Sequence, residues 1–367
     1  MSHQQSSLLL ALTIVAACRS DFRATCELKA AEPLRAVMLS ASGVTTTELE
    51  SVKADDSNAV VLRLAGRSDE DRQREAAAAQ RILKSNLQLY YWIEIARCPE
   101  LADAHPEWMA SLQGHSEWRR LFDNPPEPDK NSEVVKNYPW VPILYEEAFE
   151  AHLQRATRLL GGKPTATGIF LNDLQGGPSA CGCGHHLCRW TTDYGPIKTA
   201  TPTSDDAAAR FVNAVSKIAP DSNCIPVWAT ECEKHDGADD GLCAGVGCFK
   251  GICWKAWTKQ LTPLAEQSEH IAVLAPFKAF DRNLPLYDKP AGWITFALKS
   301  FQTFPVANNA KPVPADRLIA VLQGWDVSPV EIAAQIQRAA EAGTENYVVV
   351  KSKIDQDWQP RLHKFVK

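Results

Sequence analysis

Eight short apolar runs, rich in β-branched residues, recur along the chain, and each precedes a segment with helical periodicity. Each run is five to eight residues long, the length of a buried strand. They are Leu34–Ser40, Asn58–Leu64, Gln88–Ile95, Thr167–Asn172, Cys224–Thr230, Ile271–Ala275, Arg317–Gln323 and Asn346–Val350. The pattern therefore predicts eight strand-then-helix units.

Two of the intervening helices have recognisable starts. Ser328-Pro329-Val330-Glu331 has the spacing of a capping box with proline in the first turn, and Gly343 marks the end of that helix. Ser204, followed by two aspartates, is predicted to open a second helix, which has an apolar stripe from Phe211 to Ile218.

Eight such units predict a parallel sheet closed into a (β/α)8 TIM barrel. An open, doubly wound sheet is the alternative. It is disfavoured because Ser40-Ala41-Ser42-Gly43 stands where such a sheet would carry a glycine-rich phosphate loop. The third and fourth strands start 79 residues apart, far more than one unit needs. Long loops are thus predicted after strands three, four and five, at the face where such barrels bind substrate.

The first residues resemble an export signal. The apolar run Leu8–Ala17 is too short to cross a bilayer, which takes about 20 residues, and it ends in Val15-Ala16-Ala17-Cys18, which resembles a bacterial lipobox. We expect residues 1–17 to be a signal peptide, Cys18 to be lipidated, 18–33 to be an N-terminal segment, and 34–367 to form one barrel domain. The protein would then be a periplasmic or cell-surface lipoprotein. Cleavage by an ordinary signal peptidase, or a buried first helix, are the alternatives.

Composition limits the classes of partner that we expect the protein to bind. The 367 residues are 45% hydrophobic and carry a net charge of −5, which fits a globular protein without a basic surface for polyanions. We therefore expect no nucleic-acid partner, and contact with a membrane only through a lipid on Cys18.

Carboxylates follow several of the predicted strands. Asp173 follows strand four, Glu231 strand five and Asp326 strand seven, while Glu94 shares the inward parity of Trp92 on strand three. Parallel strands end on one face, so these acids are expected at one mouth. Paired carboxylates are what glycosidic cleavage requires. Each could instead cap a helix or pair with a cation such as Arg63 or Lys278.

Two short motifs carry a family resemblance. His105-Pro106-Glu107-Trp108 and the run Gly168 to Asp173 resemble secreted, glycoside-hydrolase-like barrel proteins of bacterial sugar-degrading systems. In related barrel glycosidases of the α-amylase and α-galactosidase groups, the nucleophile ends strand four and the acid/base residue ends strand five. The resemblance thus implies Asp173 as nucleophile, Glu231 as general acid/base and Asp326 as a third acid. Leu171 replaces the arginine of the amylase pattern.

Aromatic and polar residues near the strand ends suit a carbohydrate ligand, because indole faces stack on pyranose rings. The expected sugar-contacting residues are Trp108, Trp190, Trp325, Glu94, Asn172, Arg63 and Lys278.

Eight of the eleven cysteines fall in the three long loops: Cys98, Cys181, Cys183, Cys188, Cys232, Cys243, Cys248 and Cys253. In an exported chain they favour disulfides over a metal. A structural zinc held by Cys181, Cys183, Cys188 and Cys232 is the alternative, and we expect no other cofactor. Three functions stay open: a glycoside hydrolase acting on a plant or microbial glycan, a non-catalytic carbohydrate-binding barrel, and a zinc hydrolase using His185 and His186.

Overall fold

The computed structural model describes residues 32–109, 133–139, 141–143, 145–174, 206–229, 248–249, 252–276, 291–307, 310–352 and 361–366. The chain divides into a unit Met1–Pro33 and a unit Leu34–Lys367. Because residues 1–31 lie outside the described part, export and lipidation of Cys18 stay predictions.

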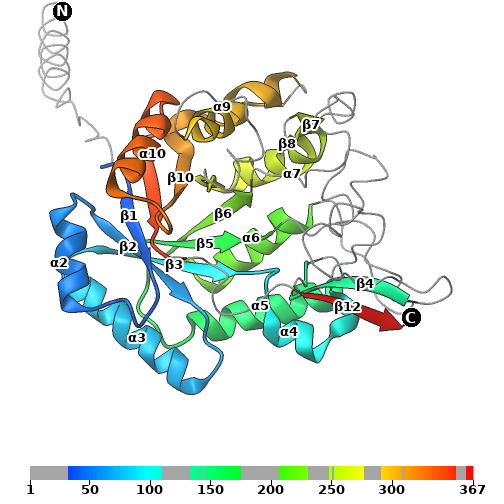
Figure 1. The fold of residues 1–367 in the computed structure, drawn as a ribbon. Helices are drawn as coiled ribbons and strands as arrows, with labels where there is room; N and C mark the ends of the chain where they lie inside the picture. Colours follow the sequence, from blue (N-terminus) through cyan, green and yellow to red (C-terminus); the bar gives the residue numbers. More distant parts are fainter. Residues whose placement is uncertain are drawn as a thin grey trace, which may run out of the picture. The chain divides into compact units, whose positions relative to one another are not determined.

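Eight parallel strands close into a barrel (Figure 1), which confirms the predicted (β/α)8 fold. The strands are β1 (Arg35–Leu39), β2 (Ala59–Leu64), β3 (Gln88–Glu94), β5 (Gly168–Asn172), β6 (Asn223–Ala229), β9 (Ile271–Leu274), β10 (Leu318–Gln323) and β11 (Asn346–Val350). Each coincides with a predicted run, and β6 begins one residue earlier than predicted. Neighbouring strands follow chain order, and β1 pairs with β11 to close the ring.

Helices connect the barrel strands. They are α2 (Thr46–Ala54), α3 (Asp69–Lys84), α4 (Pro99–Ala104), α5 (Glu146–Leu160), α6 (Ala207–Ile218), α7 (Trp254–Gln267), α9 (Gly292–Ala307) and α10 (Pro329–Glu341), with short 3-10 turns η1 (Pro106–Trp108) and η5 (Ala315–Arg317). No described helix is long and apolar enough to span a membrane.

One helix start is as predicted and one is not. Ser328 caps α10: its Oγ accepts a hydrogen bond from Glu331 N at 3.3 Å, and the Glu331 side chain accepts one from Ser328 N at 2.7 Å. The prediction that Ser204 opens α6 is wrong, because the helix begins at Ala207 behind Asp206, whose side chain makes no capping hydrogen bond. Asp206 is exposed and Ala207 to Ala209 are buried, which indicates that packing of the first turn rather than a cap stabilises this helix start.

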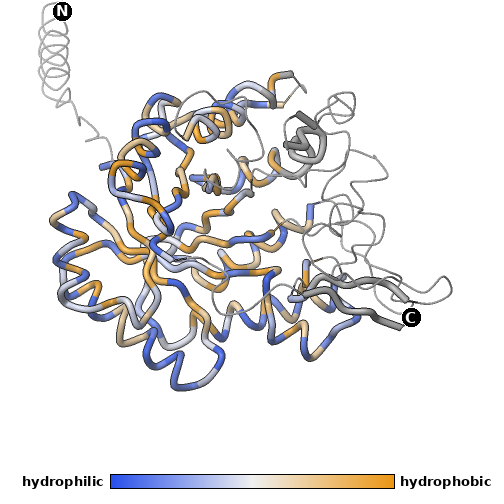
Figure 2. Tube along the Cα trace, in the orientation of Figure 1, coloured by the Kyte–Doolittle hydropathy of each residue, from blue (hydrophilic) through white to orange (hydrophobic). Residues whose placement is uncertain are grey.

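Apolar side chains form two large clusters. One fills the barrel interior and includes Met38, Trp92, Phe170 and Val321; the other lies between the strands and the helices. Figure 2 shows the strands as largely hydrophobic, while the helices alternate between hydrophobic and hydrophilic positions. The alternation along each strand divides its side chains between the two clusters.

Two additional sheets were not predicted. In the long connection after β3, β4 (Glu133–Tyr138) pairs antiparallel with β12 (Arg361–Val366), in the register Tyr138 to Arg361. A second small hairpin, β7 (Cys248–Phe249) with β8 (Ile252–Cys253), places Cys248 opposite Cys253 in the backbone register.

Candidate active site

The polar site begins where the apolar filling of the barrel ends. Trp92 and Phe170 lie in register on β3 and β5, and their rings stack with centroids 5.6 Å apart. Two residues further along, Glu94 and Asn172 are again in register. Side chains two positions apart share a face of a strand, so Glu94 and Asn172 lie directly above the aromatic pair. Both are buried, which is the inward placement that parity predicts for Glu94.

Hydrogen bonds fix the Glu94 carboxylate. Its Oε1 accepts a hydrogen bond from Trp92 Nε1 at 2.5 Å, and its Oε2 accepts one from Asn172 Nδ2 at 2.8 Å. Arg155 Nη1, from α5, donates to the Glu94 backbone oxygen at 2.7 Å. The carboxylate is thus held by donors from two strands.

Asp173 follows β5 in an unusual backbone conformation. Its φ is 60°, in the left-handed region that few residues other than glycine, asparagine and aspartate adopt. The side chain is 1% exposed, and Oδ2 lies 3.0 Å from Arg97 Nε. Burial raises the pKa of Asp173 to about 7; Arg97 opposes this, while the charge of Glu94 and a hydrogen bond with it add to the increase. Near neutral pH this carboxyl group therefore exists in both protonation states.

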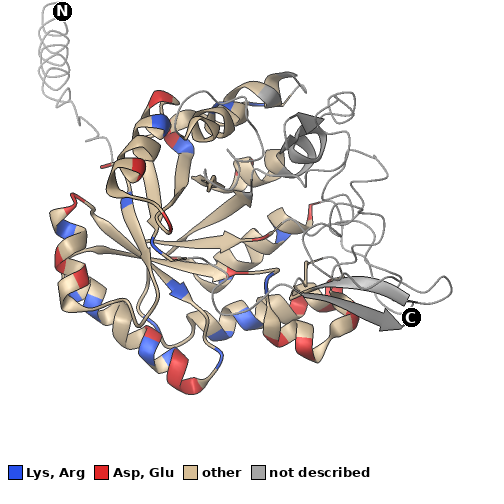
Figure 3. Cartoon of the chain, viewed as in Figure 1, with Lys and Arg blue, Asp and Glu red and all other residues tan. Residues whose placement is uncertain are grey.

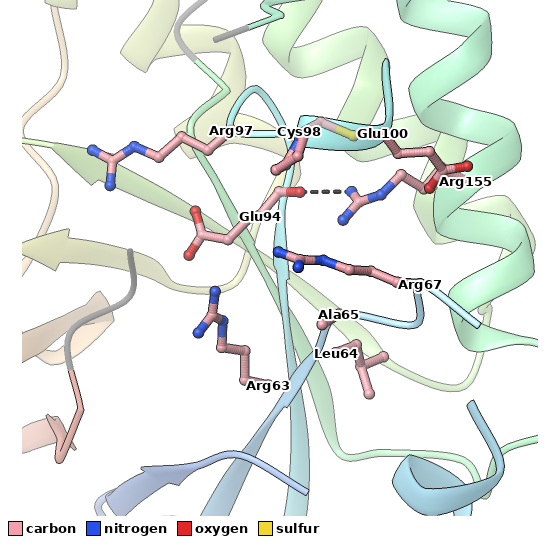
Figure 4. Close-up of a pocket in the computed structure, with 10 residues that line it drawn as sticks. Arg63, Leu64, Ala65, Arg67, Glu94, Arg97, Cys98, Glu100 and Arg155 are labelled. Carbon is pink, nitrogen blue, oxygen red and sulfur yellow. Dashed lines mark hydrogen bonds between the residues drawn. The ribbon is translucent and has the colours of Figure 1, made fainter. Parts of the chain in front are cut away.

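A pocket opens beside these acids, between the ends of β2 and β3 and helix α5 (Figure 4). About 410 Å³ of space lies among its lining residues, part of it open solvent. Its lining comprises Arg63, Leu64, Ala65, Arg67, Glu94, Arg97, Cys98, Pro99, Glu100 and Arg155. The structure thus brings together Arg63 and Glu94, both expected to contact substrate, with three arginines that the sequence reasoning missed.

A signal for one missed residue was present. Arg155 lies on the buried face of α5 together with Phe149, His152 and Leu159, so a charge interrupts the apolar stripe of an amphipathic helix. Figure 3 shows basic and acidic residues spread over the helices of the barrel. Among the described charged residues of these helices, Glu75 and Arg155 are buried. Arg67 and Arg97 follow β2 and β3 by only a few residues, a position that could have marked them.

The end of β10 forms a different part of the mouth. Gln323 is buried, and its Nε2 donates to Trp325 O at 3.0 Å. Trp325 is half-buried and packs against the interior cluster, while Asp326 is exposed and has a φ of 56°. Trp325 therefore presents part of its indole ring at the barrel end, where a sugar could stack on it.

Trp108 has different neighbours. Its ring stacks on His105 with centroids 3.7 Å apart, and it packs against a separate cluster that includes Met109, Tyr138 and Tyr145. Trp108 is not among the residues that line the pocket.

Several predicted residues lie outside the described part of the chain: Glu231, Trp190, Lys278, Cys181, Cys183, Cys188 and Cys232. Cys98 is buried and forms no disulfide in the structure, so it does not support the expected cross-link at that position. Among described residues, no group of three or more histidine, cysteine or acidic side chains could hold a metal ion.

Comparison with known proteins gives a fold likeness only. No protein-family model and no curated protein matches the chain. Among solved structures, GH5_18 from Streptomyces cattleya in complex with GlcNAc is 13% identical over 89% of this chain and 73% of that one, with a TM-score of 0.45. A beta-mannanase from the blue mussel Mytilus edulis is 12% identical over 86% and 82%, with a TM-score of 0.39. Dihydropteroate synthase from Thermus thermophilus is 10% identical over 87% and 89%, with a TM-score of 0.34.

Proposed function

We propose that this chain is a glycoside hydrolase-like enzyme that cleaves glycosidic bonds in a plant or microbial glycan. The observation that carries the proposal is the buried carboxyl pair Glu94 and Asp173 at the carboxyl ends of β3 and β5, beside a pocket. The pKa of Asp173 is raised to about 7, in the range where a carboxyl group can hold a proton at neutral pH and still release it.

Hydrolysis of a glycosidic bond needs one acid that protonates the leaving oxygen and one carboxylate that acts at the anomeric carbon or on water. The raised pKa of Asp173 supports the first of these roles. We therefore assign Asp173 as proton donor, in place of the nucleophile role that the resemblance implies. Glu94 lines the pocket, whereas Asp173 is 1% exposed. We therefore assign Glu94 as the residue of the pair that contacts substrate, and Asp173 as the group that supplies the proton.

The second carboxylate is assigned by position. Glu231 follows β6, the strand next to β5, and is the candidate for nucleophile or base. Asp326, beyond β10, is the candidate for holding a sugar hydroxyl, with Trp325 as the stacking platform. A non-catalytic carbohydrate-binding barrel remains the second candidate, supported by the half-buried indole at the mouth.

The test is a screen of the purified chain against aryl glycosides and oligosaccharides. Asp173→Asn and Glu231→Gln keep side-chain shape and remove the ionisable group, so each should lower kcat by about 100-fold to 10,000-fold on any glycan the parent cleaves. Asp221→Asn is the matched control: this aspartate is exposed and precedes β6 at the opposite end of the strand, so its variant should retain parental activity.

The other outcomes separate the alternatives. Near-parental activity of both variants would refute the assignment. Binding of a glycan that is never cleaved would support the binding barrel, and activity lost on chelation would support the zinc hydrolase. For an active enzyme, the anomer released first, followed by NMR, distinguishes retention from inversion.

A further inference from the structure

The pocket beside Glu94 has a charge balance opposite to that of the chain. Overall, 44 acidic residues outnumber 39 basic ones. The pocket lining instead contains four arginines and two carboxylates. Figure 4 shows that the four arginines come from different elements: Arg63 from β2, Arg67 from the loop after it, Arg97 from the loop after β3, and Arg155 from α5. The Arg97 guanidinium points away from those of Arg67 and Arg155.

The acidic groups nearby are already engaged. Glu100 lines the pocket, and its Oε1 lies 2.6 Å from Nη2 of Arg158, which is not a lining residue. Asp173 lies 3.0 Å from Arg97 Nε. The Glu94 carboxylate accepts hydrogen bonds from Trp92 and Asn172, and Figure 4 shows the Arg63 guanidinium pointing toward it.

Two arginines are left without a carboxylate. In the part of the chain that the structure describes, no acidic side chain pairs with Arg155 or Arg67. Arg155 gives the stronger argument, because it is 7% exposed and its side chain donates a hydrogen bond to a neutral acceptor, the Glu94 backbone oxygen. A buried cation is unfavourable unless an anion lies close, so a buried guanidinium lining a pocket indicates an anionic ligand.

We propose that this pocket binds the anionic substituent of a sugar, either the carboxylate of a uronic acid or a sulfate or phosphate ester. The inference rests on the proposed function for its sugar component. A guanidinium donates two parallel hydrogen bonds to two oxygens of such a group, and its charge does not titrate near neutral pH. Because Glu94 lines the same pocket, the charged ring is bound next to the acid pair.

The experiment is calorimetric titration of the full chain at low salt with four probes: sodium glucuronate, inorganic sulfate, inorganic phosphate and glucose. At least one anion should bind more tightly than glucose, and its Kd should rise as sodium chloride is added. Preference for glucuronate assigns a uronic acid, and preference for sulfate or phosphate assigns an ester. If no anion binds more tightly than glucose, the inference is wrong.

Arginine substitutions test whether the anion binds in this pocket. Arg155→Gln should raise the Kd of the preferred anion about tenfold or more, and Arg67→Gln, at an exposed position, about threefold or more. Arg74→Gln is the control, because Arg74 is largely exposed, pairs with Asp71 and lies outside the pocket, so the Kd should not change. If Arg155→Gln does not fold, Arg67→Gln decides. An unchanged Kd in Arg67→Gln and in any folded Arg155→Gln protein would overturn the assignment to this pocket.

The two proposals can fail separately. Cleavage of neutral glycans with no anion binding would remove the inference and keep the hydrolase. Arginine-dependent anion binding without cleavage of any glycan would remove the hydrolase and keep the anion site.

Discussion

Two buried helix side chains hold strand ends at the barrel mouth, and they do so with different chemistry. Glu75 of α3 accepts hydrogen bonds from Ala65 N at 2.7 Å and Gly66 N at 2.8 Å, just after β2. Gln335 of α10 accepts from Gln323 N at 2.9 Å and donates to Gln323 O at 2.7 Å, at the end of β10. Each interaction joins a helix to the strand that precedes it.

The backbone groups at each strand end match the choice of side chain. After β2 the chain turns at Gly66, with φ +48°, and offers two consecutive N–H groups, which a carboxylate can accept together. Gln323 offers one N–H and one C=O, which an amide satisfies with both of its ends. The carboxylate needs a counter-charge, supplied by Lys163 Nζ at 3.2 Å with only 1% of its side chain exposed. The amide needs none.

Each of these two helix-to-strand contacts also positions a residue of the candidate site. The turn held by Glu75 leads directly to Arg67, which lines the pocket. The end of β10 held by Gln335 leads to Trp325, whose backbone oxygen accepts from the Gln323 side chain. The mouth therefore has a side at β2, β3 and β5 where carboxylates such as Glu94 and Asp173 are buried, and a more open side at β10, where Trp325 is half-buried and Asp326 is exposed.

The largest expected effect comes from removing the charge of Glu75. Glu75→Gln leaves Lys163 buried without its carboxylate, so the free energy of unfolding should fall by about 3 to 5 kcal/mol, measured by urea denaturation. Glu70→Gln, at a solvent-exposed position on the same helix, should leave the urea midpoint near that of the parent. Equal midpoints for Glu75→Gln and parent would show that the charge on this side is dispensable.

Asp173 and Asp326, the two left-handed aspartates that follow barrel strands, give the second test. The pKa of Asp173 is raised in the folded chain, so its stabilising contribution is full below about pH 4 and is lost as pH rises through about 7. Asp173→Asn tolerates the same φ and removes this dependence. Relative to the parent, the variant should gain on the order of 3 kcal/mol between about pH 4 and pH 8.

Asp326→Asn is the control on the open side, because Asp326 has a φ of 56° but is exposed. At pH 7 its thermal unfolding midpoint should lie close to that of the parent, because substitutions at exposed positions usually change stability little. If Asp173→Asn also follows the parent, the buried side does not hold a titrating proton.

Removal of the Gln335 side-chain amide should have the smallest effect on stability. Gln335→Ala leaves the N–H and C=O of Gln323 without their side-chain partner and should cost about 2 kcal/mol of unfolding free energy. Gln337→Ala, at an exposed position of the same helix, is the control and should be close to neutral. A cost for Gln335→Ala as large as that for Glu75→Gln would erase the distinction between the two sides.

The strands could be predicted from sequence because parallel barrel strands are buried on both faces, which leaves continuous apolar runs. The inward position of Glu94 followed from parity with Trp92. The conformation of Asp173 could not be predicted, since a left-handed residue after a strand depends on the packing around it. Nor could the antiparallel pairing of β4 with β12, because those strands lie more than 200 residues apart and no local turn links them.

The sequence predicted only part of the pocket lining. Arg63 and Glu94 are strand residues, so periodicity located them, whereas Arg155 reaches the site from a helix whose packing on the barrel is a tertiary property. Its position on an apolar face was a usable signal, although periodicity alone does not say which strand end lies opposite that helix.

The pairing of β4 with β12 also sets an order of events during translation. At about 5 to 20 residues per second, the ribosome adds residues 361–366 on the order of 10 to 50 seconds after β4 has been made. During that interval β4 has no partner from this sheet, and its backbone edge is open to other nascent strands. The pairing of β4 is thus completed only after residues 361–366 have been made, more than 200 residues later, which makes β4 a segment for a chaperone to shield.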